Sequence, residues 1–241
     1  MTPDPDSAPA APARADASSD LLLAMLADAR LPTGSHAHSA GLEPAVLAGL
    51  TDGGRHLKDV PAYAATRLAT VTATEAGAAV VARHHWLLGH RDLRDVEEAW
   101  CARTASPALR AASRALGRGY LRLATSLWPE ALNASFDRGA APPRPVVLGV
   151  VAAVAGLPAL SLARLVGYDD VQSIVSAALK LVPLDPAEGM RWVLALHPAI
   201  DTMAEAVAGL TDPALIPARG APMTDVNAEM HALTTRRLFS A

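Results

Sequence analysis

Two histidines beside a glycine turn have the spacing of metal ligands. His36 and His38 flank Ala37 in the segment LPTGSHAHSAG. In an extended loop, side chains at positions i and i+2 lie on the same side, so both imidazoles can reach one transition-metal ion. The alternative is that the two rings hydrogen-bond the turn or face a partner. We favour this alternative and keep metal ligation by His36 and His38 as a second hypothesis.

The sequence lacks the motifs of several common enzyme classes. It contains no GxxxxGK[ST] phosphate loop, no HExxH, no GxSxG and no CxxC. Glu97 and Glu98 are adjacent and point to different sides of a helix, so we interpret them as a solvated face rather than a catalytic pair. The single cysteine, Cys101, excludes an internal disulfide and a cysteine-rich zinc site. We therefore expect no catalysis and no cofactor.

A row of arginines recurs every four residues along one predicted helix. Its members are Arg110, Arg114, Arg118 and Arg122. Like charges at this spacing repel each other by a few tenths of a kcal/mol per pair. Water, carboxylates elsewhere in the fold or an acidic partner must offset that cost. We favour solvated or internally paired side chains, and a binding surface remains the alternative.

The C-terminal sequence RRLFSA is unusual for a chain end. Free ends usually fray and are polar, whereas Leu238 and Phe239 would expose apolar surface unless they dock. An apolar anchor beside Arg236 and Arg237 has the composition of an interface hot spot. We favour a tail that docks on a partner over one that docks on its own fold.

Helices must position these residues, because the composition favours helix throughout. Hydrophobic residues make up 51% of the 241 residues and aromatic residues only 4%, so Ala, Leu and Val must fill the core. Ala and Leu are strong helix formers, and small residues let helices approach closely. No run alternates apolar and polar residues over the length of a strand. We predict an all-α fold, with one domain of about ten helices over residues 20–241.

The longest uncharged run, VVLGVVAAVAGLPALSLA at 146–163, is the predicted centre of that domain. Its eighteen residues reach the lower limit of a membrane span. Gly156 and Pro158 interrupt it, because a proline removes a helix hydrogen bond and pushes the preceding residue out of the α region. We predict a buried helix over 146–155, a break, and a second helix that Pro158 opens. A membrane-associated protein remains an alternative.

Caps, prolines and glycines predict the other helices. We expect them over 21–29, from about 42 to 49, over 59–88 with a bend at Gly77, from Asp92, over 107–128, from Pro158 to a stop at Gly167, from Asp169 or Asp170 to 181, over 186–197 and 198–209, and from Thr224 or Asp225 onward. We expect several side chains on common helix faces: Leu93, Val96 and Trp100; Leu109, Leu116, Tyr120, Leu123 and Leu127 turned inward; and Val226, Met230 and Leu233.

The overall charge and the N-terminal sequence indicate which partners and which cellular compartment to expect. A formal net charge of −3 gives no support for nucleic-acid binding, which usually leaves a basic footprint. Residues 1–19 are mainly Pro, Ala, Asp and Ser, with no large apolar side chain after Met1, so we expect a disordered tail. The N-terminus does not have the basic-then-apolar pattern of a signal peptide. We expect a cytoplasmic protein.

The segment LPTGSHAHSAGLEPAVLAG resembles the N-terminal signature of the UreF family of urease accessory proteins. The matching residues are Leu31, Pro32, Gly34, Ser39, Gly41, Leu42, Glu43, Ala45 and Val46. The resemblance continues in family order through RPVVLGVVAAVAGL (144–157), VSAALKLVPL (175–184) and AEMHALTTRRLFSA (228–241). The chain departs from the family pattern at Lys180, Asp185 and Ala232, and at Pro44 near the helix start.

The resemblance implies a helical protein that dimerises and is not an enzyme. In the family, it binds a UreD-type (or UreH-type) accessory protein and recruits the UreG GTPase, and the assembly delivers nickel to the urease apoprotein. Both chain ends order when the UreD-type protein binds. The resemblance therefore places partner contacts at Pro32, Gly34, His36, Ser39, Gly41, Leu42 and Glu43, and in the tail from about 224 to 241 at His231, Arg236, Arg237, Leu238 and Phe239.

Three hypotheses follow from the sequence. The first is a non-enzymatic scaffold of urease maturation, with no nucleic-acid or membrane partner. The second is a helical metal-binding protein or hydrolase that uses His36 and His38. The third is a membrane-associated protein organised by residues 146–163. We favour the first, because it explains both the missing catalytic motifs and the apolar, arginine-flanked C-terminus.

Overall fold

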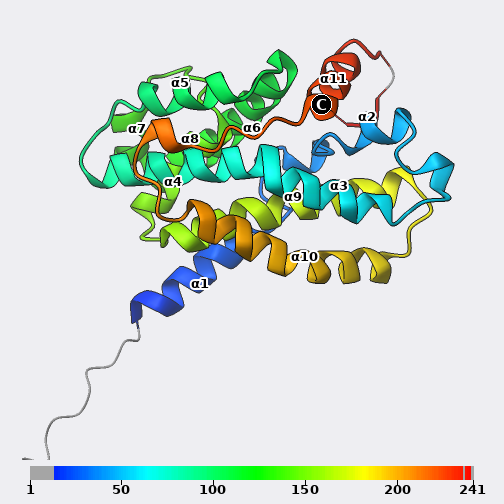
Figure 1. Ribbon diagram of the computed structural model, residues 1–241. Coiled ribbons are helices and arrows are strands. Elements are labelled where there is room, and N and C mark those ends of the chain that lie inside the picture. The colour runs from blue at the N-terminus through cyan, green and yellow to red at the C-terminus, as the bar shows by residue number, and fades with distance from the viewer. Residues whose placement is uncertain (1–13, 236, 240–241) are drawn as a thin grey trace, which may run out of the picture.

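A computed structural model describes residues 14–235 and 237–239, and over that range the chain is helical with no strand (Figure 1). The predicted all-α fold is confirmed. The helices are α1 (Arg14–Leu26), α2 (Leu42–Leu47), α3 (Asp59–Arg67), α4 (Ala73–Leu87), α5 (Arg94–Arg103), α6 (Pro107–Leu127), α7 (Pro129–Ser135), α8 (Arg144–Val154), α9 (Ala159–Leu181), α10 (Pro186–Val207) and α11 (Pro222–Ala232). Short 3-10 turns occupy Ser35–Ala37, Asp52–Gly54 and Pro213–Leu215.

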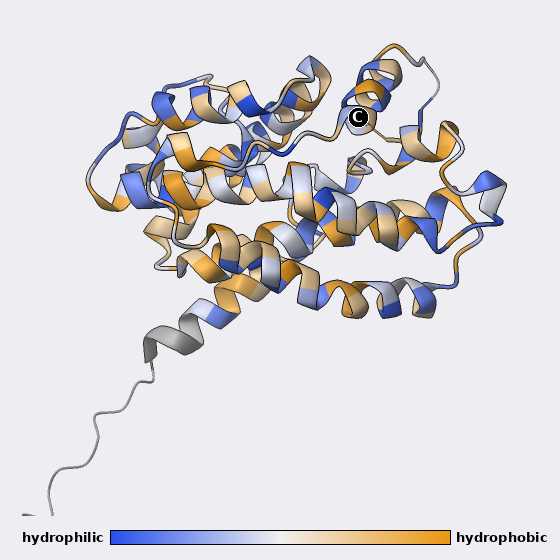
Figure 2. Ribbon diagram, viewed as in Figure 1, coloured by the Kyte–Doolittle hydropathy of each residue, from blue (hydrophilic) through white to orange (hydrophobic). Residues whose placement is uncertain are grey.

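Helix α8 lies at the centre, as the sequence predicts. Every residue from Arg144 to Ala153 is buried, and α4, α6 and α9 pack around it. Gly149 allows α4 to approach closely, because a Cβ there would lie 2.5 Å from the carbonyl oxygen of Ala79. Figure 2 shows hydrophobic residues through the middle of the bundle and hydrophilic residues gathered at helix ends and outer turns.

The predicted break in the central run is also confirmed. Helix α8 ends at Val154, Gly156 adopts a φ of +72°, and Pro158 precedes the first residue of α9. Glycine suits this turn because a side chain at positive φ is strained. Among the described residues, no helix combines the length and apolar character needed to cross a membrane.

Helices α9 and α10 are longer than predicted. The expected stop at Gly167 and the expected cap at Asp169 or Asp170 are wrong, because α9 runs unbroken from Ala159 to Leu181. Gly167 lies buried inside it, and a Cβ there would come within 2.8 Å of the Met203 side chain of α10. The glycine serves close packing of two helices rather than termination. Likewise α10 continues past Pro198 to Val207, so the predicted break at His197 is wrong.

The long predicted helix over 59–88 is irregular at a different place from Gly77. Its irregularity is a π-helical turn at Leu68–Thr72, which separates α3 from α4. Gly77 lies within regular helix and faces Pro217, whose Cδ would be 2.8 Å from an added Cβ. Tertiary packing therefore explains this glycine. A π-turn has no simple sequence signature, and such turns often occur at functional sites.

The N-terminal helix differs most from its predicted bounds. It spans Arg14–Leu26 instead of 21–29, so residues 14–19 of the predicted disordered tail are helical. The rest of that tail, residues 1–13, lies outside the described residues. In α5 the predicted inward face is confirmed, since Leu93, Val96 and Trp100 are all buried. In α6 one predicted inward residue, Leu127, is 46% exposed, because it lies at the helix end beside the start of α7.

Candidate functional site

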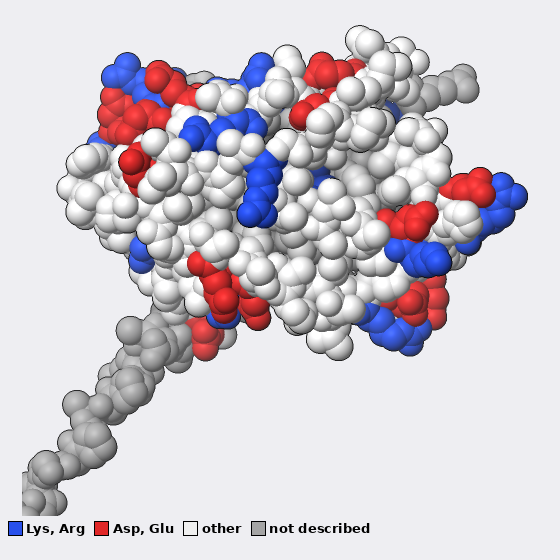
Figure 3. Space-filling model, in the orientation of Figure 1, with Lys and Arg blue, Asp and Glu red and all other residues white. Residues whose placement is uncertain are grey.

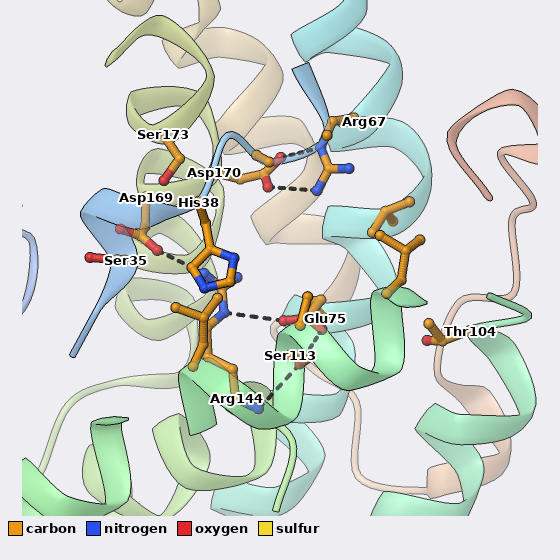
Figure 4. A pocket seen from close by; sticks show the side chains of 16 residues that line it. Ser35, His38, Arg67, Glu75, Thr104, Ser113, Arg144, Asp169, Asp170 and Ser173 are labelled. Carbon is orange, nitrogen blue, oxygen red and sulfur yellow. Dashed lines mark hydrogen bonds and ion pairs between the residues drawn. The ribbon is translucent and has the colours of Figure 1, made fainter. Parts of the chain in front are cut away.

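The glycine-rich segment after α1 (residues 31–41, the covering segment) lies over a small pocket of about 90 Å³ (Figure 4). Ser35, His38 and Gly41 of this segment form one side of it. The other walls come from α3, α4, α6, α8 and α9, which contribute Arg67, Glu75, Ser113, Arg144, Asp169, Asp170 and Ser173. A cavity of this size with so many polar groups suits a few ordered water molecules. The segment therefore lies over a cluster of polar and charged side chains, with apolar residues such as Leu109 and Leu116 also lining the pocket.

A bidentate ion pair between α3 and α9 forms one half of this cluster. The Arg67 guanidinium donates from Nη2 to Asp170 Oδ1 at 2.8 Å and from Nε to Oδ2 at 3.1 Å. The Thr72 hydroxyl, in the π-turn, donates to the same Oδ2 at 2.7 Å. Both charged side chains are only 7% exposed. Removing one partner would leave the other charge buried and unpaired, which is costly.

The second half of the cluster centres on Arg144 at the start of α8. Its Nη1 lies 2.7 Å from Asp169 Oδ2, and its Nε lies 3.2 Å from Glu75 Oε2. The other oxygen of Glu75 accepts hydrogen bonds from Trp100 Nε1 at 3.1 Å and from the Ser113 hydroxyl at 3.0 Å. One guanidinium thus connects α8 to α4 and α9, and through Glu75 to α5 and α6.

The pKa values of the two adjacent aspartates, Asp169 and Asp170, are shifted in opposite directions. Burial raises the pKa of Asp170, but Arg67 and the hydrogen bonds to its carboxylate outweigh burial, so its pKa lies below the ordinary value. Burial also raises the pKa of Asp169, and the neighbouring charges of Asp170 and Glu75 add to this against the pull of Arg144. The pKa of Asp169 therefore lies above its ordinary value.

The backbone of the covering segment is shaped by two glycines at positive φ. Gly34 has a φ of +86° and Gly41 a φ of +74°. A Cβ on Gly41 would lie 2.8 Å from Tyr63 Oη, whose hydroxyl donates to the carbonyl of Ala40 at 3.0 Å. The Ser39 hydroxyl accepts from the backbone N–H of Glu43 at 3.3 Å, as a capping residue does. Helix α2 begins at Leu42, as predicted.

Glu43 connects this segment to the C-terminus. Its buried carboxylate accepts hydrogen bonds from the backbone N–H groups of Leu238 at 2.7 Å and Phe239 at 3.0 Å. His231 Nε2 of α11 lies 3.0 Å from the same carboxylate. Five predicted site residues are therefore brought together: Leu42, Glu43, His231, Leu238 and Phe239. A glutamate suits this position because it accepts several hydrogen bonds at once.

In this structure the tail docks on its own fold at Phe239, and docking of the tail on a partner stays a prediction. Phe239 is 4% exposed, and Lys180 Nζ lies 5.0 Å from its ring centroid, within cation–π range. Sequence reasoning missed this because the Glu43 acceptor lies 196 residues away. Leu238, in contrast, is 70% exposed, and Arg237 is exposed too. Arg236 lies outside the described residues.

The two candidate metal ligands have different surroundings. His36 is exposed in the turn Ser35–Ala37, whereas His38 is partly buried and points into the cavity beside Arg144 (Figure 4). Within the described part of the chain, no group of three or more His, Cys, Asp or Glu side chains is placed to hold a metal ion. Pro32 is exposed and Gly34 partly buried, near the start of the covering segment.

The departures from the signature pattern have local explanations. Pro44 lies in the first turn of α2, where a backbone N–H has no partner within the helix. Asp185 caps α10 by accepting from the Ala187 N–H at 3.0 Å. Lys180 stacks on Phe239, and Ala232 is exposed at the end of α11. Pro44, Asp185 and Lys180 are therefore each compatible with the local structure.

The buried charges are the residues that sequence reasoning missed. Arg67 and Asp170 are 103 residues apart, so no motif links them. One signal was available, because Asp169 and Asp170 interrupt an otherwise apolar stretch, as Arg144 does at the start of the central run. A charge inside an apolar pattern calls for a partner, although it does not identify that partner.

Helix α11 carries a row of exposed apolar side chains. Met223 is 68% exposed, Val226 53%, Met230 63% and Leu233 80%. The inner face is fixed to the domain, since Ala228 and His231 are buried and Glu229 accepts from the Ser106 hydroxyl and from the Ala108 N–H. The predicted helical face over 226–233 is real, but it points outward. Figure 3 shows charges gathered mainly in small mixed clusters around the margin of this view, with a largely uncharged middle.

Comparisons with known proteins agree on one family. A family model described as UreF matches residues 55–197. The urease accessory protein UreF of Mycobacterium sp. (strain JLS) is 38% identical over 221 residues, which cover 91% of this chain and 97% of that protein. The proteins of the same name from Mycobacterium marinum and Mycolicibacterium vanbaalenii are 36% and 38% identical, and each match covers 91% of this chain and 98% and 97% of the relative.

Replacing Asp170 with asparagine tests the buried ion pair. At pH 7 we expect Asp170→Asn to lower the free energy of unfolding by about 3–5 kcal/mol, because Arg67 is left buried without a counter-charge. The pKa of Asp170 is lowered in the fold, so its contribution is present above its unfolded pKa and is lost as pH falls through the folded value. The difference from the unsubstituted protein should therefore shrink below about pH 4. Urea unfolding at several pH values measures it.

Asp201→Asn is the matched control, because Asp201 pairs with Arg164 at the surface and both side chains are about half exposed. We expect it to change the free energy of unfolding by less than about 1 kcal/mol. An Asp170→Asn protein as stable as this control at pH 7 would contradict the role given to the buried pair.

Replacing Glu43 with glutamine tests the attachment of the tail. The amide keeps one acceptor oxygen but turns an NH₂ group toward backbone donors, so at least one tail N–H loses its partner. We expect hydrogen exchange at the amides of Leu238 and Phe239 to accelerate by about tenfold or more, as one charge-assisted hydrogen bond is removed. Glu188→Gln, at a half-exposed carboxylate on α10, is the control and should leave these amides unchanged. Unchanged exchange in both variants would rule out Glu43 as the residue that holds the tail.

Proposed function

This chain belongs to the UreF family of urease accessory proteins, and we propose that it acts as a non-enzymatic scaffold in urease maturation. In this proposal it joins a UreD-type (or UreH-type) accessory protein to the UreG GTPase. The assembly then delivers nickel to the urease apoprotein, so nickel is cargo rather than a cofactor of this chain. We further propose that the chain works in the cytoplasm as a homodimer.

The exposed apolar row on α11 is the observation that supports this proposal most strongly. Met223, Val226, Met230 and Leu233 expose half or more of their side chains on one short helix. Moving one large aliphatic side chain from water into a dry interface contributes about 1.5–3 kcal/mol. A row of such side chains beside a fixed inner face is typical of a protein-binding surface. We assign this row to the UreD-type partner.

The held tail supplies a second surface close to the first. Glu43 fixes the backbone at residues 238 and 239, and Phe239 is buried. With the backbone held at residues 238 and 239, Leu238 is exposed beside Arg237, so an apolar side chain and a guanidinium are presented from an anchored backbone. Binding to a preorganised segment avoids part of the entropy cost of association. We assign Arg237 and Leu238 to the GTPase.

The experiment expresses a urease operon whose accessory set contains this chain or a variant, and measures urease activity and nickel content of the purified urease. We expect Met230→Glu with Leu233→Glu to reduce both by about tenfold or more, because two charges would be desolvated in the proposed interface. The control is Leu127→Glu with Leu215→Glu, two exposed apolar residues away from α11, and it should retain activity.

A second variant separates the two assigned surfaces. Arg237→Glu with Leu238→Glu should still co-purify with the UreD-type protein but should lose the GTPase. Normal nickel content with the α11 variant would contradict the assignment of that surface. Loss of activity with the control variant as well would show that the effect is not specific to α11.

A further inference from the structure

A groove beside α6 and α7 uses the arginines that the scaffold proposal leaves unassigned. It consists of two adjoining hollows of about 620 Å³ and 400 Å³. They share Asn133, Phe136, Asp137 and Ala140 as lining residues, so they lie side by side. The remaining walls come from α6, from the start of α5 and the residues before it, and from the segment that leads into α8.

The arginine row of α6 divides into two pairs. Arg110 donates to the carbonyls of Thr104 and Ala105, and Arg114 pairs with Glu97 at 2.6 Å and donates to the Ala141 carbonyl. These first two arginines are used inside the fold, as we favoured. Arg118 and Arg122 are exposed, and within the described residues neither has a hydrogen bond or an ion pair.

A third arginine is brought to the same hollow by a tight turn. The Ala140 N–H donates to the Asp137 carbonyl at 3.1 Å, and Gly139 has a φ of +81°, which glycine adopts without strain. Arg138 lies inside this turn and lines the smaller hollow together with Arg118 and Arg122. It is also exposed and, among the described residues, without an ion pair.

The smaller hollow is positively charged in a chain that is acidic overall. Its charged lining residues are three arginines and Asp137, which gives 3 − 1 = +2, whereas the whole chain carries −3. Unpaired like charges that the fold holds close together repel each other, and an anionic partner relieves that repulsion. This concentration of charge therefore favours an anionic occupant.

The floor of the hollow is apolar. Leu132 is fully buried, and Leu121 and Phe136 are partly buried. A lone inorganic phosphate would leave such a floor uncovered, and the hollow is far larger than one phosphate. The net charge of −3 gives the chain no overall attraction for the backbone of a nucleic acid. An apolar floor with an arginine rim is instead matched by a peptide that has one apolar side chain between carboxylates.

We propose that this groove docks an acidic peptide segment of a partner protein. Carboxylates of the segment contact Arg118, Arg122 and Arg138, and one apolar side chain enters the hollow above Phe136. The proposal goes beyond the scaffold function, since it uses neither α11 nor the tail. It can therefore fail while the scaffold proposal stands, and the reverse also holds.

The test measures binding of two defined peptides to the full-length chain by isothermal titration calorimetry in about 0.15 M potassium chloride. The probes are Ac-EEELEEE-NH₂ and Ac-EEESEEE-NH₂, which differ only in the central side chain. We expect the leucine peptide to bind about tenfold more tightly, because its side chain is buried in the hollow. Phe136→Ala should reduce the preference for the leucine peptide over the serine peptide. The part of the binding that depends on the arginines should remain.

Charge reversal at the rim is compared with charge reversal elsewhere. Arg118→Glu with Arg122→Glu should weaken binding of the leucine peptide by about tenfold or more. The control, Arg30→Glu with Arg55→Glu, changes the net charge equally at two exposed arginines outside the groove, and should weaken binding by less than about twofold.

Four outcomes would overturn the proposal. The first is an equal loss of binding in the two charge-reversal variants, which would indicate long-range attraction alone. The second is no binding of either peptide. The third is competition by inorganic phosphate beyond that of chloride at equal ionic strength, which would indicate a small-anion site. The fourth is a change in oligomeric mass caused by Arg118→Glu with Arg122→Glu, which would make the groove an interface between copies of this chain.

Discussion

Two arginines are buried at one place in an alanine-rich bundle, and the helices around them are arranged to pair their charges. Arg67 and Arg144 lose their hydration there, and among the described residues the carboxylates of Asp170, Asp169 and Glu75 compensate for it. The contacts join α3 to α9, and α8 to both α4 and α9, so these four helices are fixed relative to one another. The apolar contacts around α8 are made largely by small residues, which provide close packing but few distinctive shapes. The charged cluster adds geometric specificity that alanine and valine cannot supply.

The covering segment links the charged cluster to the surface of the molecule. Its glycines and the Tyr63 hydrogen bond set its path over the cluster, and the Ser39 hydroxyl accepts from the backbone N–H of Glu43 near the start of α2. The Glu43 carboxylate in turn accepts hydrogen bonds from two backbone N–H groups of the tail. The acidic residue of the signature-like segment therefore has a structural task, which is to hold the backbone at residues 238 and 239. The exposed side chains of α11 and Leu238 are presented by this rigid support.

Much of the architecture was predictable, because local signals dictated it. The break at Gly156 and Pro158, the caps at Ser106 and Asp185, and the buried face of α5 all follow from the residues at those positions. The errors at Gly167 and Gly77 have one cause. A glycine that permits close packing has the same letter as a glycine that ends a helix, and only the neighbouring helix distinguishes them. Part of the candidate site was predictable, because the sequence pattern identified its covering segment. The pairing of Arg67 with Asp170 and the hydrogen bond from Leu238 to Glu43 could be recognised only from the three-dimensional fold.

We propose above all that this chain is a scaffold with two partner surfaces. The decisive measurement is the mass, by light scattering, of the complex formed when the chain is co-expressed with the UreD-type and UreG-type proteins of its own source. We expect one stable complex that contains all three proteins, with this chain present in two copies. A chain that elutes alone as a monomer, while the other two proteins are folded and present, would contradict it.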